Sequence, residues 1–258
     1  MASTAPPHSI PYSGPRRNAG MSLVELAVVV AIIGLLSVVV SAGYSDAAAQ
    51  SAATTAKADA EAARQAIRAF ALRNKRLPCP DLSATGDPAR EGHNGTCPSG
   101  AQVGWLPYES LGLTRPDRER RLRYAVSREG ADLVAPPAVA SARPDLDGST
   151  RFRAALAAAA RLPASTNRPF LTGPGSSASP EDCGFIQSNP AFALIAPVTD
   201  RDGNSPVPAG FDGVNVGMAV SNQNCIAAPS RRATADNDDV VVAESAGALL
   251  GWLAARTR

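Results

Sequence analysis

The feature that most limits how this chain can fold is an apolar segment of 22 residues near its N-terminus, Ser22 to Gly43, whose one charged side chain is Glu25. As an α-helix this segment would be about 33 Å long, and the hydrocarbon layer of a bilayer is about 30 Å thick. The sequence therefore predicts a membrane-spanning helix. The alternatives are a buried core helix, which is usually shorter and striped, and a cleavable secretory signal, whose apolar part is usually about 7–15 residues.

The charge distribution predicts which side of the membrane each part occupies. Lys and Arg number 25 against 23 Asp and Glu, and the first twenty residues contain Arg16 and Arg17 without any acid. By the positive-inside rule, the N-terminus is cytoplasmic and everything after about Tyr44 is exported. The total charge of +2 is too small to indicate a nucleic-acid-binding protein.

Glu25 is the most informative residue of the apolar segment. A carboxylate near the centre of a membrane costs about 2.5–3.5 kcal/mol, so such a residue suggests a function and a partner. The nearest partner is an amine created by cutting the chain just before the helix, and snorkelling of Glu25 to the headgroups is the alternative. The stretch Gly20-Met21-Ser22-Leu23-Val24-Glu25-Leu26, preceded by Arg16 and Arg17, resembles the cleavage and methylation site of type IV pilins and type II secretion pseudopilins.

The resemblance implies a processing site and a set of partners. Prepilin peptidase would cut between Gly20 and Met21, the new amine of Met21 would be methylated, and Glu25 would face the terminal amine of a neighbouring subunit. Met21 stands where the family usually has phenylalanine. The protein would cross the inner membrane once, with its head in the periplasm, before joining other pilin or pseudopilin subunits in a pilus or pseudopilus.

The resemblance also implies an α+β pilin fold, with a long N-terminal helix packed on an antiparallel β-sheet head. The expected domains are a leader at 1–20, the membrane-spanning and assembly half of the helix at 21–45, its amphipathic half at 46–76, and an exported head at 77–258. Alanine-rich sequence without Gly or Pro from Tyr44 to Leu77 predicts one helix from about Ser22 to Arg73.

The outer half of this helix has an apolar stripe that is expected to pack on other helices and on the sheet. The stripe repeats by threes and fours, as one face of a helix does. Its members are Ala53, Ala56, Ala60, Ala63, Ile67 and Phe70. Pro78 and Pro80 then stop the helix.

The head contains four cysteines, Cys79, Cys97, Cys183 and Cys225. An even number in an exported domain favours disulfides, and the sequence allows three pairings. Proximity along the chain favours Cys79 with Cys97 and Cys183 with Cys225. A zinc site that uses His93 is the alternative, but the spacing does not match structural zinc motifs.

A second resemblance follows the long helix. The segments Leu77–Asp81, Gly104–Tyr108, Leu111–Leu113 and Leu122–Val126, in this order, resemble a subgroup of pilin-like proteins recognised only by their N-terminal signal. Arg115–Arg121 replaces the aspartate-tryptophan-glycine turn that is usual there.

Further elements of the head are predicted from composition. Strands are expected at Leu122–Val126, Ala191–Pro197 and Asp239–Ala243, followed by a short helix at Ala246–Ala255. Val134 to Pro190, with an alanine-rich helix at Phe152–Leu162, is expected to be an insertion that offers a surface to a partner.

Calcium is a candidate ligand, because Asp200, Asp202 and Asn204 place oxygen atoms at alternate positions around a glycine. No glutamate closes the loop at its twelfth position, and Asp212 falls one place late. The other acids that compete as ordinary solvated turn residues are Asp145, Asp147, Asp236, Asp238 and Asp239. The sequence therefore predicts no cofactor and no metal, with calcium as the alternative.

Enzyme signatures are missing from the exported part of the sequence. Its only histidine is His93, and it contains neither a Gly-x-Ser-x-Gly elbow nor a phosphate-binding loop. Together with this absence, the resemblance at the N-terminal signal implies a non-enzymatic minor pilin or pseudopilin, with a large head that suits a tip or low-abundance position. The alternative is a periplasmic enzyme or receptor held by an uncleaved anchor.

Overall fold

A computed structural model describes residues 22–92, 96–135, 148–173, 183–198, 210–234 and 237–256, without the side chains of residues 36 and 38–46. The chain divides into two compact units, Met1–Ala47 and Ala48–Arg258. The second unit contains all of the strands and most of the core.

One long helix, α1 (Leu23–Asn74), is the first element, close to the predicted bounds. At its start the backbone N–H of Glu25 donates to Ser22 Oγ at 3.2 Å, which satisfies one of the unpaired donors of the first turn. At its end Lys75 adopts a left-handed conformation with φ of 55°, and its N–H bonds back to the carbonyl of Ala71. This reversal turns the chain toward the Pro78–Pro80 segment.

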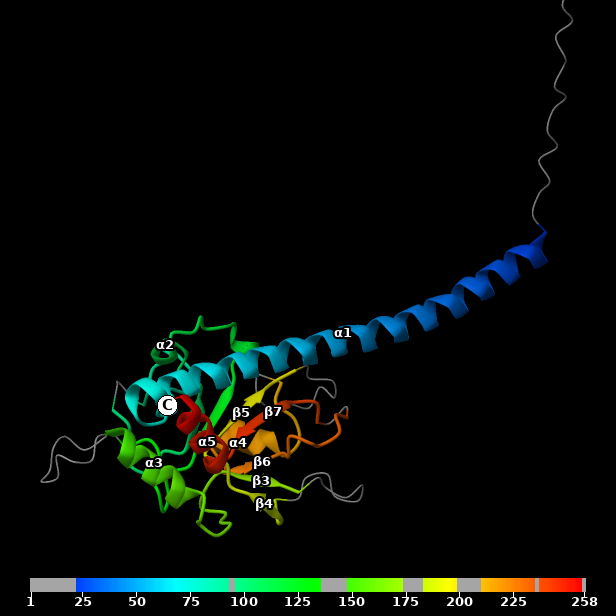
Figure 1. Cartoon of the computed structure of the whole chain (residues 1–258). Helices are drawn as coiled ribbons and strands as arrows, with labels where there is room; N and C mark the ends of the chain where they lie inside the picture. Colours follow the sequence, from blue (N-terminus) through cyan, green and yellow to red (C-terminus); the bar gives the residue numbers. More distant parts are fainter. Residues whose placement is uncertain are drawn as a thin grey trace, which may run out of the picture. The chain divides into compact units, whose positions relative to one another are not determined.

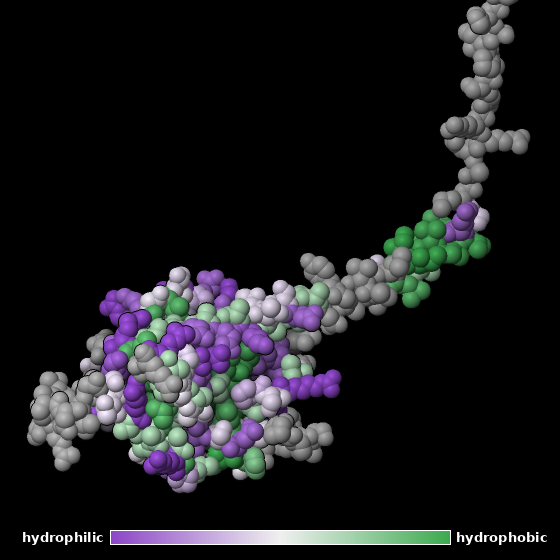
Figure 2. Space-filling view, viewed as in Figure 1, coloured by the Kyte–Doolittle hydropathy of each residue, from purple (hydrophilic) through white to green (hydrophobic). Residues whose placement is uncertain are grey.

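The N-terminal part of α1 exposes apolar side chains, which form a hydrophobic surface in Figure 2. Leu23 is 86% exposed and Leu35 is 70% exposed. Among the described residues, no helix combines the length and the apolar character that crossing a membrane requires. The predicted spanning segment, 21–45, includes position 21 and side chains at 36 and 38–45 that lie outside the described residues.

The apolar stripe of the outer half of α1 is buried in the head, as the spacing predicts. Ala60 and Ile67 are fully buried, Phe70 is 5% exposed, and Ala71 adds a buried position that the stripe did not include. Ala53, at the start of the stripe, is half-buried. Figure 1 shows this part of α1 lying across the sheet.

The main sheet is antiparallel and has four strands in the order β1-β2-β5-β7. Their bounds are β1 (Val103–Trp105), β2 (Arg123–Val126), β5 (Phe192–Ala196) and β7 (Val240–Glu244). The three predicted strands are therefore confirmed as β2, β5 and β7, and β1 was not predicted. Because side chains alternate along a strand, Phe192 and Leu194 enter the core beneath α1, whereas Ala193 and Ile195 enter a second core on the opposite face.

A second sheet of three strands has the order β4-β3-β6. Its strands are β3 (Phe170–Thr172), β4 (Ile186–Ser188) and β6 (Cys225–Ile226), with β3 antiparallel to β4 and parallel to β6. The sequence did not predict this sheet. The predicted insertion, 134–190, contributes two of its strands to the folded head.

Five shorter helical elements complete the head. They are α2 (Tyr108–Leu111), the 3-10 helix η1 (Arg118–Arg120), α3 (Gly148–Ala159), α4 (Asn215–Ser221) and α5 (Ala246–Arg256). Leu156 of α3 and Leu249 of α5 share the core with the α1 stripe, and Met218 of α4 lies in the second core. The α+β class with an N-terminal helix and an antiparallel sheet is thus confirmed. The pilin fold itself and the predicted domain boundaries stay predictions.

Candidate functional site

The predicted processing site lies at the start of the chain. Gly20 and Met21 are outside the described residues. Glu25 lies in the first turn of α1, where its side chain is exposed. A negative charge in the first turn is favourable because the unpaired N–H groups give the helix N-terminus a partial positive charge. Glu25 and the exposed apolar turns after it form a surface that a second helix can cover.

A buried ion pair fastens α1 to the end of β7. Glu244 is 3% exposed, and its two carboxylate oxygens accept from Arg68 Nη2 at 2.7 and 2.9 Å. Arg64 adds a second cation, 3.8 Å from Glu244 Oε2, and the Arg68 guanidinium lies 5.4 Å from the ring of Trp252 on α5. Because a buried charge that loses its partner is costly, this contact fixes α1 against β7 and α5.

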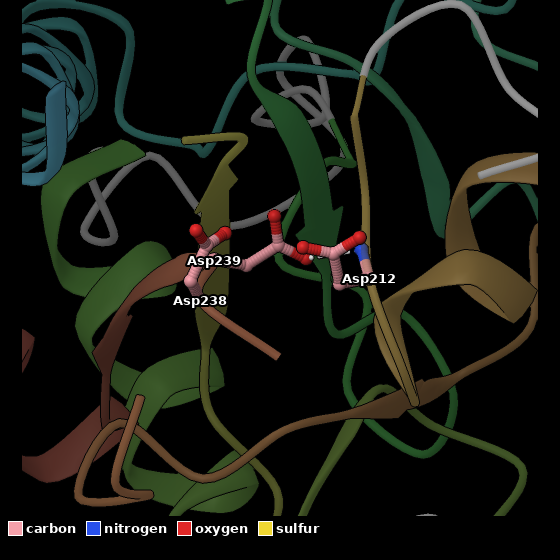
Figure 3. Close-up of side chains that lie close together, drawn as sticks. All are labelled: Asp212, Asp238 and Asp239. Atoms are coloured by element: carbon pink, nitrogen blue, oxygen red, sulfur yellow. Dashed lines mark hydrogen bonds between the residues drawn. The ribbon is translucent and has the colours of Figure 1, made fainter. Parts of the chain in front are cut away.

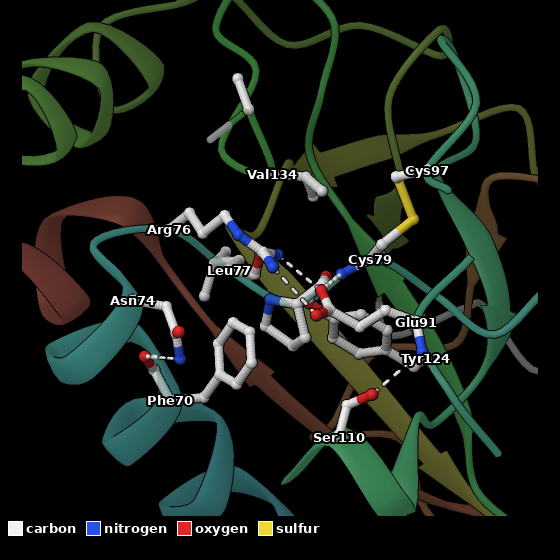
Figure 4. Close-up of polar contacts among 12 residues, drawn as sticks. Phe70, Asn74, Arg76, Leu77, Cys79, Glu91, Cys97, Ser110, Tyr124 and Val134 are labelled. Atoms are coloured by element: carbon white, nitrogen blue, oxygen red, sulfur yellow. Dashed lines mark hydrogen bonds and ion pairs between the residues drawn. A yellow bond between two sulfur atoms is a disulfide. The ribbon is translucent and has the colours of Figure 1, made fainter. Parts of the chain in front are cut away.

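A second polar network fixes the turn after α1 (Figure 4). Arg76 makes two hydrogen bonds with Glu91, at 2.5 and 2.9 Å. Glu91 also accepts from the backbone N–H of Cys79 at 2.7 Å, while its own N–H donates to Ser110 Oγ. Tyr124 donates its hydroxyl to the carbonyl of Pro78 at 3.0 Å, and burial raises the pKa of this phenol. The LPCPD turn is thus held by side chains from three segments.

The Arg115–Arg121 segment replaces the turn that the second resemblance leads one to expect, and it makes contacts of its own. Arg120 pairs with Asp59 of α1 at 2.6 Å, and Arg115 pairs with Asp87 at 2.5 Å. Both pairs are exposed, so each contributes only about 0–1 kcal/mol. The Arg120–Asp59 pair therefore links η1 to α1 with little gain in stability, whereas the mostly buried Arg121 donates hydrogen bonds to the carbonyls of Thr85 and Pro116.

The four cysteines form the two disulfides that proximity along the chain favours. Cys79 pairs with Cys97, and Cys183 pairs with Cys225. The first closes the loop after α1, and the second joins the segment before β4 to β6, so it fastens the second sheet. His93, considered above as a zinc ligand, lies outside the described residues.

Three carboxylates come together beside β7: Asp238 and Asp239, which the sequence analysis gave as turn residues, and Asp212, which fell one place late for the predicted calcium loop. One oxygen of each of Asp212, Asp238 and Asp239 lies within 4.8 Å of the others (Figure 3). Asp239 Oδ2 accepts from the Asp212 N–H at 3.0 Å and from Asn215 Nδ2 at 2.9 Å. The predicted calcium ligands Asp200, Asp202 and Asn204 lie outside the described residues.

The electrostatics of this acidic cluster favour the loss of negative charge. Burial raises the pKa of Asp239 well above its usual value, the charges of Asp212 and Asp238 raise it further, and the two hydrogen bonds oppose the shift. A proton or a bound cation would each relieve the repulsion. Sequence spacing does not reveal the cluster, because the turn before α4 and the start of β7 are far apart in the chain.

Comparison with known proteins supports the N-terminal motif. Residues 15–41 match the family model of the prokaryotic N-terminal methylation motif, the prepilin-type signal of type IV pilins and pseudopilins. The motif implies processing by prepilin peptidase and assembly with other pilins, and it indicates a structural subunit. Searches of curated proteins and of solved structures found no match.

Proposed function

We propose that the chain is a minor pilin or pseudopilin. Prepilin peptidase cuts after Gly20 and methylates the amine of Met21, and the mature subunit joins a type IV pilus or a type II secretion pseudopilus. The observation that supports the proposal is the match over residues 15–41. With the proposed cut after Gly20, Glu25 would be the fifth residue of the mature chain.

The apolar start of α1 has two roles in this proposal. Before assembly it holds the subunit in the inner membrane, where the exposed side chains of Leu23–Leu35 meet lipid. During assembly the same surface packs against the helices of neighbouring subunits. The Glu25 carboxylate then neutralises the terminal amine of one neighbour, and a subunit out of register leaves both charges unpaired in an apolar bundle.

The contacts within the head support a structural role. The Arg68–Glu244 pair joins α1 to the end of β7, and the Arg76–Glu91 network holds the turn that follows α1. Force applied to the helix during extraction from the membrane is then passed to the whole head. A head of this size obstructs close helical repetition, which favours a tip or low-abundance position.

Mass spectrometry of the mature N-terminus tests the proposal. The expected product begins with N-methylated Met21. A chain that still begins at Met1 would instead favour a periplasmic enzyme or receptor on an uncleaved anchor, and a cut near Ala49 would indicate a secretory signal. Deletion of the gene, scored in parallel for twitching, transformation and protein secretion, then assigns the filament system.

A further inference from the structure

The main sheet has one closed edge and one open edge. At the β1 edge, Trp105 exchanges two backbone hydrogen bonds with Asp81, at 2.8 and 2.9 Å, so the edge is capped. At the other edge, the backbone of Val240–Ala243 pairs with β5 and has no further backbone partner in the part of the chain that the structure describes. Alternate N–H and C=O groups of β7 therefore point outward unpaired.

The residues of β7 are exposed along the edge of the sheet that has no neighbouring strand among the described residues. Val240 and Val242 pack against the core beneath α1, while Val241 and Ala243 pack against the second core. Both faces of the strand are therefore covered, yet all four residues are half-exposed, whereas every residue of β5 is buried. The accessible part of β7 therefore lies along the edge that does not pair with β5.

A groove of about 410 Å³ runs along this edge. One wall is α1, with Lys57, Glu61 and Arg64, and the other is formed by residues between Ala227 and Ala233. Val240–Ala243 and the acids Asp238 and Asp239 complete the lining. Arg64 is paired with Glu61 and lies near Glu244, whereas exposed Lys57 has no ion pair among the described residues. Lys57 is therefore the cation of the α1 wall that has no ion pair among the described residues, and the acids of the groove, Asp238 and Asp239, lie mostly buried at the start of β7.

Apart from the buried Glu244 at its end, the strand has few of the features that usually protect a sheet edge. Its sequence, Val-Val-Val-Ala-Glu, has no proline or lysine, and its register with β5 is continuous. Natural proteins block or twist exposed edges to prevent pairing with another chain. An unblocked edge beside a groove is the arrangement that accepts an added strand, with main-chain hydrogen bonds supplying affinity.

We propose that β7 is a docking edge for an extended segment of the adjacent pilin-type subunit, which adds as a fifth strand and places a carboxylate against Lys57. This inference rests on the proposed function, because that function supplies the neighbour. The unpaired main-chain groups specify an extended backbone as the occupant, and the charge of Lys57 specifies the acid.

Hydrogen exchange at single-residue resolution tests the proposal on the full chain, first in detergent and then in assembled filaments. Outward N–H groups alternate along a strand, so assembly is expected to slow exchange about tenfold or more at alternate residues of Val240–Ala243. Lys57→Glu is expected to reduce this protection. Arg118→Glu makes the same change of charge on exposed η1 and serves as the matched control, with protection retained.

Each other outcome is decisive. Equal exchange in filaments and in detergent overturns strand addition while the proposed function stands, and uniform slowing of all four amides shows a cover without strand pairing. If the alternate amides of β7 are already protected in detergent and the protein there has the mass of a dimer, a second copy of this chain occupies the edge. That result also contradicts the proposal. A chain that never enters a filament removes the proposed function and the strand proposal together.

Discussion

Three carboxylates of this chain lie in different environments, and each environment has a different effect on the charge of the side chain. Glu25 is exposed in an apolar part of α1, Glu244 is buried against Arg68, and Asp239 is crowded by two other acids. In the proposed assembly, Glu25 pairs with a cation from another subunit. The second stabilises the head through a cation of its own chain, and the third is relieved by a proton or a bound ion.

The Arg68–Glu244 pair gives a prediction about stability. Arg68→Ala leaves a carboxylate that is 3% exposed without its main partner, so the free energy of unfolding is expected to fall by about 3 kcal/mol, the lower end of the range for breaking a buried pair, because Arg64 remains near. Urea unfolding in detergent measures the change. Arg73→Ala, at an exposed position of the same helix, is the control, and equal losses in the two variants would contradict the role of the pair.

Asp239 gives a prediction about pH. Its pKa is raised in the folded protein, so the folded state binds the proton more tightly than the unfolded state does. Stability is then highest below the unfolded pKa of about 4 and falls as the pH rises through the folded value. Asp239→Asn is expected to lose this decline and to be more stable than the parent at pH 7, with the difference vanishing near pH 4.

Thermal unfolding in EDTA from pH 4 to pH 8 measures the effect. Asp117→Asn, at an exposed position, should follow the parent at every pH. A decline that persists in Asp239→Asn would show that another group causes it. Replacing EDTA with calcium tests cation binding, which would raise the melting temperature of the parent more than that of the variant.

At the scale of elements, α1 depends on small side chains. The helix approaches the sheet closely because Ala56, Ala60 and Ala63 present only methyl groups to the core. Larger residues enter only near the end of the helix, at Ile67 and Phe70. The contact is therefore set by shape at one end and by apolar area at the other.

Enlarging the stripe is expected to destabilise the head. Ala60→Leu places three extra carbon atoms at a fully buried position, and overpacking of this kind costs about 1–3 kcal/mol. Ala58→Leu has the same helix propensity change at an exposed position and is expected to leave the free energy of unfolding within about 0.5 kcal/mol of the parent. Chemical unfolding of both variants checks this, and a smaller loss for Ala60→Leu than for Ala58→Leu would refute the packing account.

The elements that the sequence predicted are those with a strong local pattern. The length of α1 followed from alanine propensity and from Pro78, and β2, β5 and β7 are short segments rich in aromatic, β-branched or other apolar residues. The second sheet could not be found in this way, because its strands are two or three residues long and are held by a disulfide and by pairing across the chain.

The same distinction between local and long-range patterns applies to the residues of the candidate site. Gly20, Met21 and Glu25 lie within one short stretch of sequence that matches the methylation motif, so the sequence alone was enough to predict roles for them, and these roles stay predictions. Asp212 and Asp239 meet only because a loop before α4 packs on the start of β7, and no local pattern encodes such a meeting. The partner of Glu244 was also hidden, although the i, i+4 spacing of Arg64 and Arg68 beside the apolar stripe was visible in the sequence.

At the scale of the whole molecule, the two ends of α1 have different tasks in the proposed function. The N-terminal part carries the processed signal and the surface for neighbouring helices. The C-terminal part is built into the head by an apolar stripe and by the Arg68–Glu244 pair, and the Arg76–Glu91 network fixes the turn that follows it. A subunit of this design can be altered at Glu25 without harm to the head, so assembly and folding are separable by mutation.

The most direct test of the proposed role of Glu25 in assembly is to measure how much of the Glu25→Gln variant is incorporated into filaments. The amide keeps the size of the side chain but cannot neutralise the amine of a neighbour, and an unpaired charge in an apolar bundle costs about 3–5 kcal/mol, so incorporation is expected to fall by at least about 100-fold. Cleavage after Gly20 and the melting temperature of the head should be unchanged, and Glu119→Gln, the same substitution on exposed η1, should assemble normally. Glu25→Gln subunits that enter filaments as readily as the parent would contradict the account.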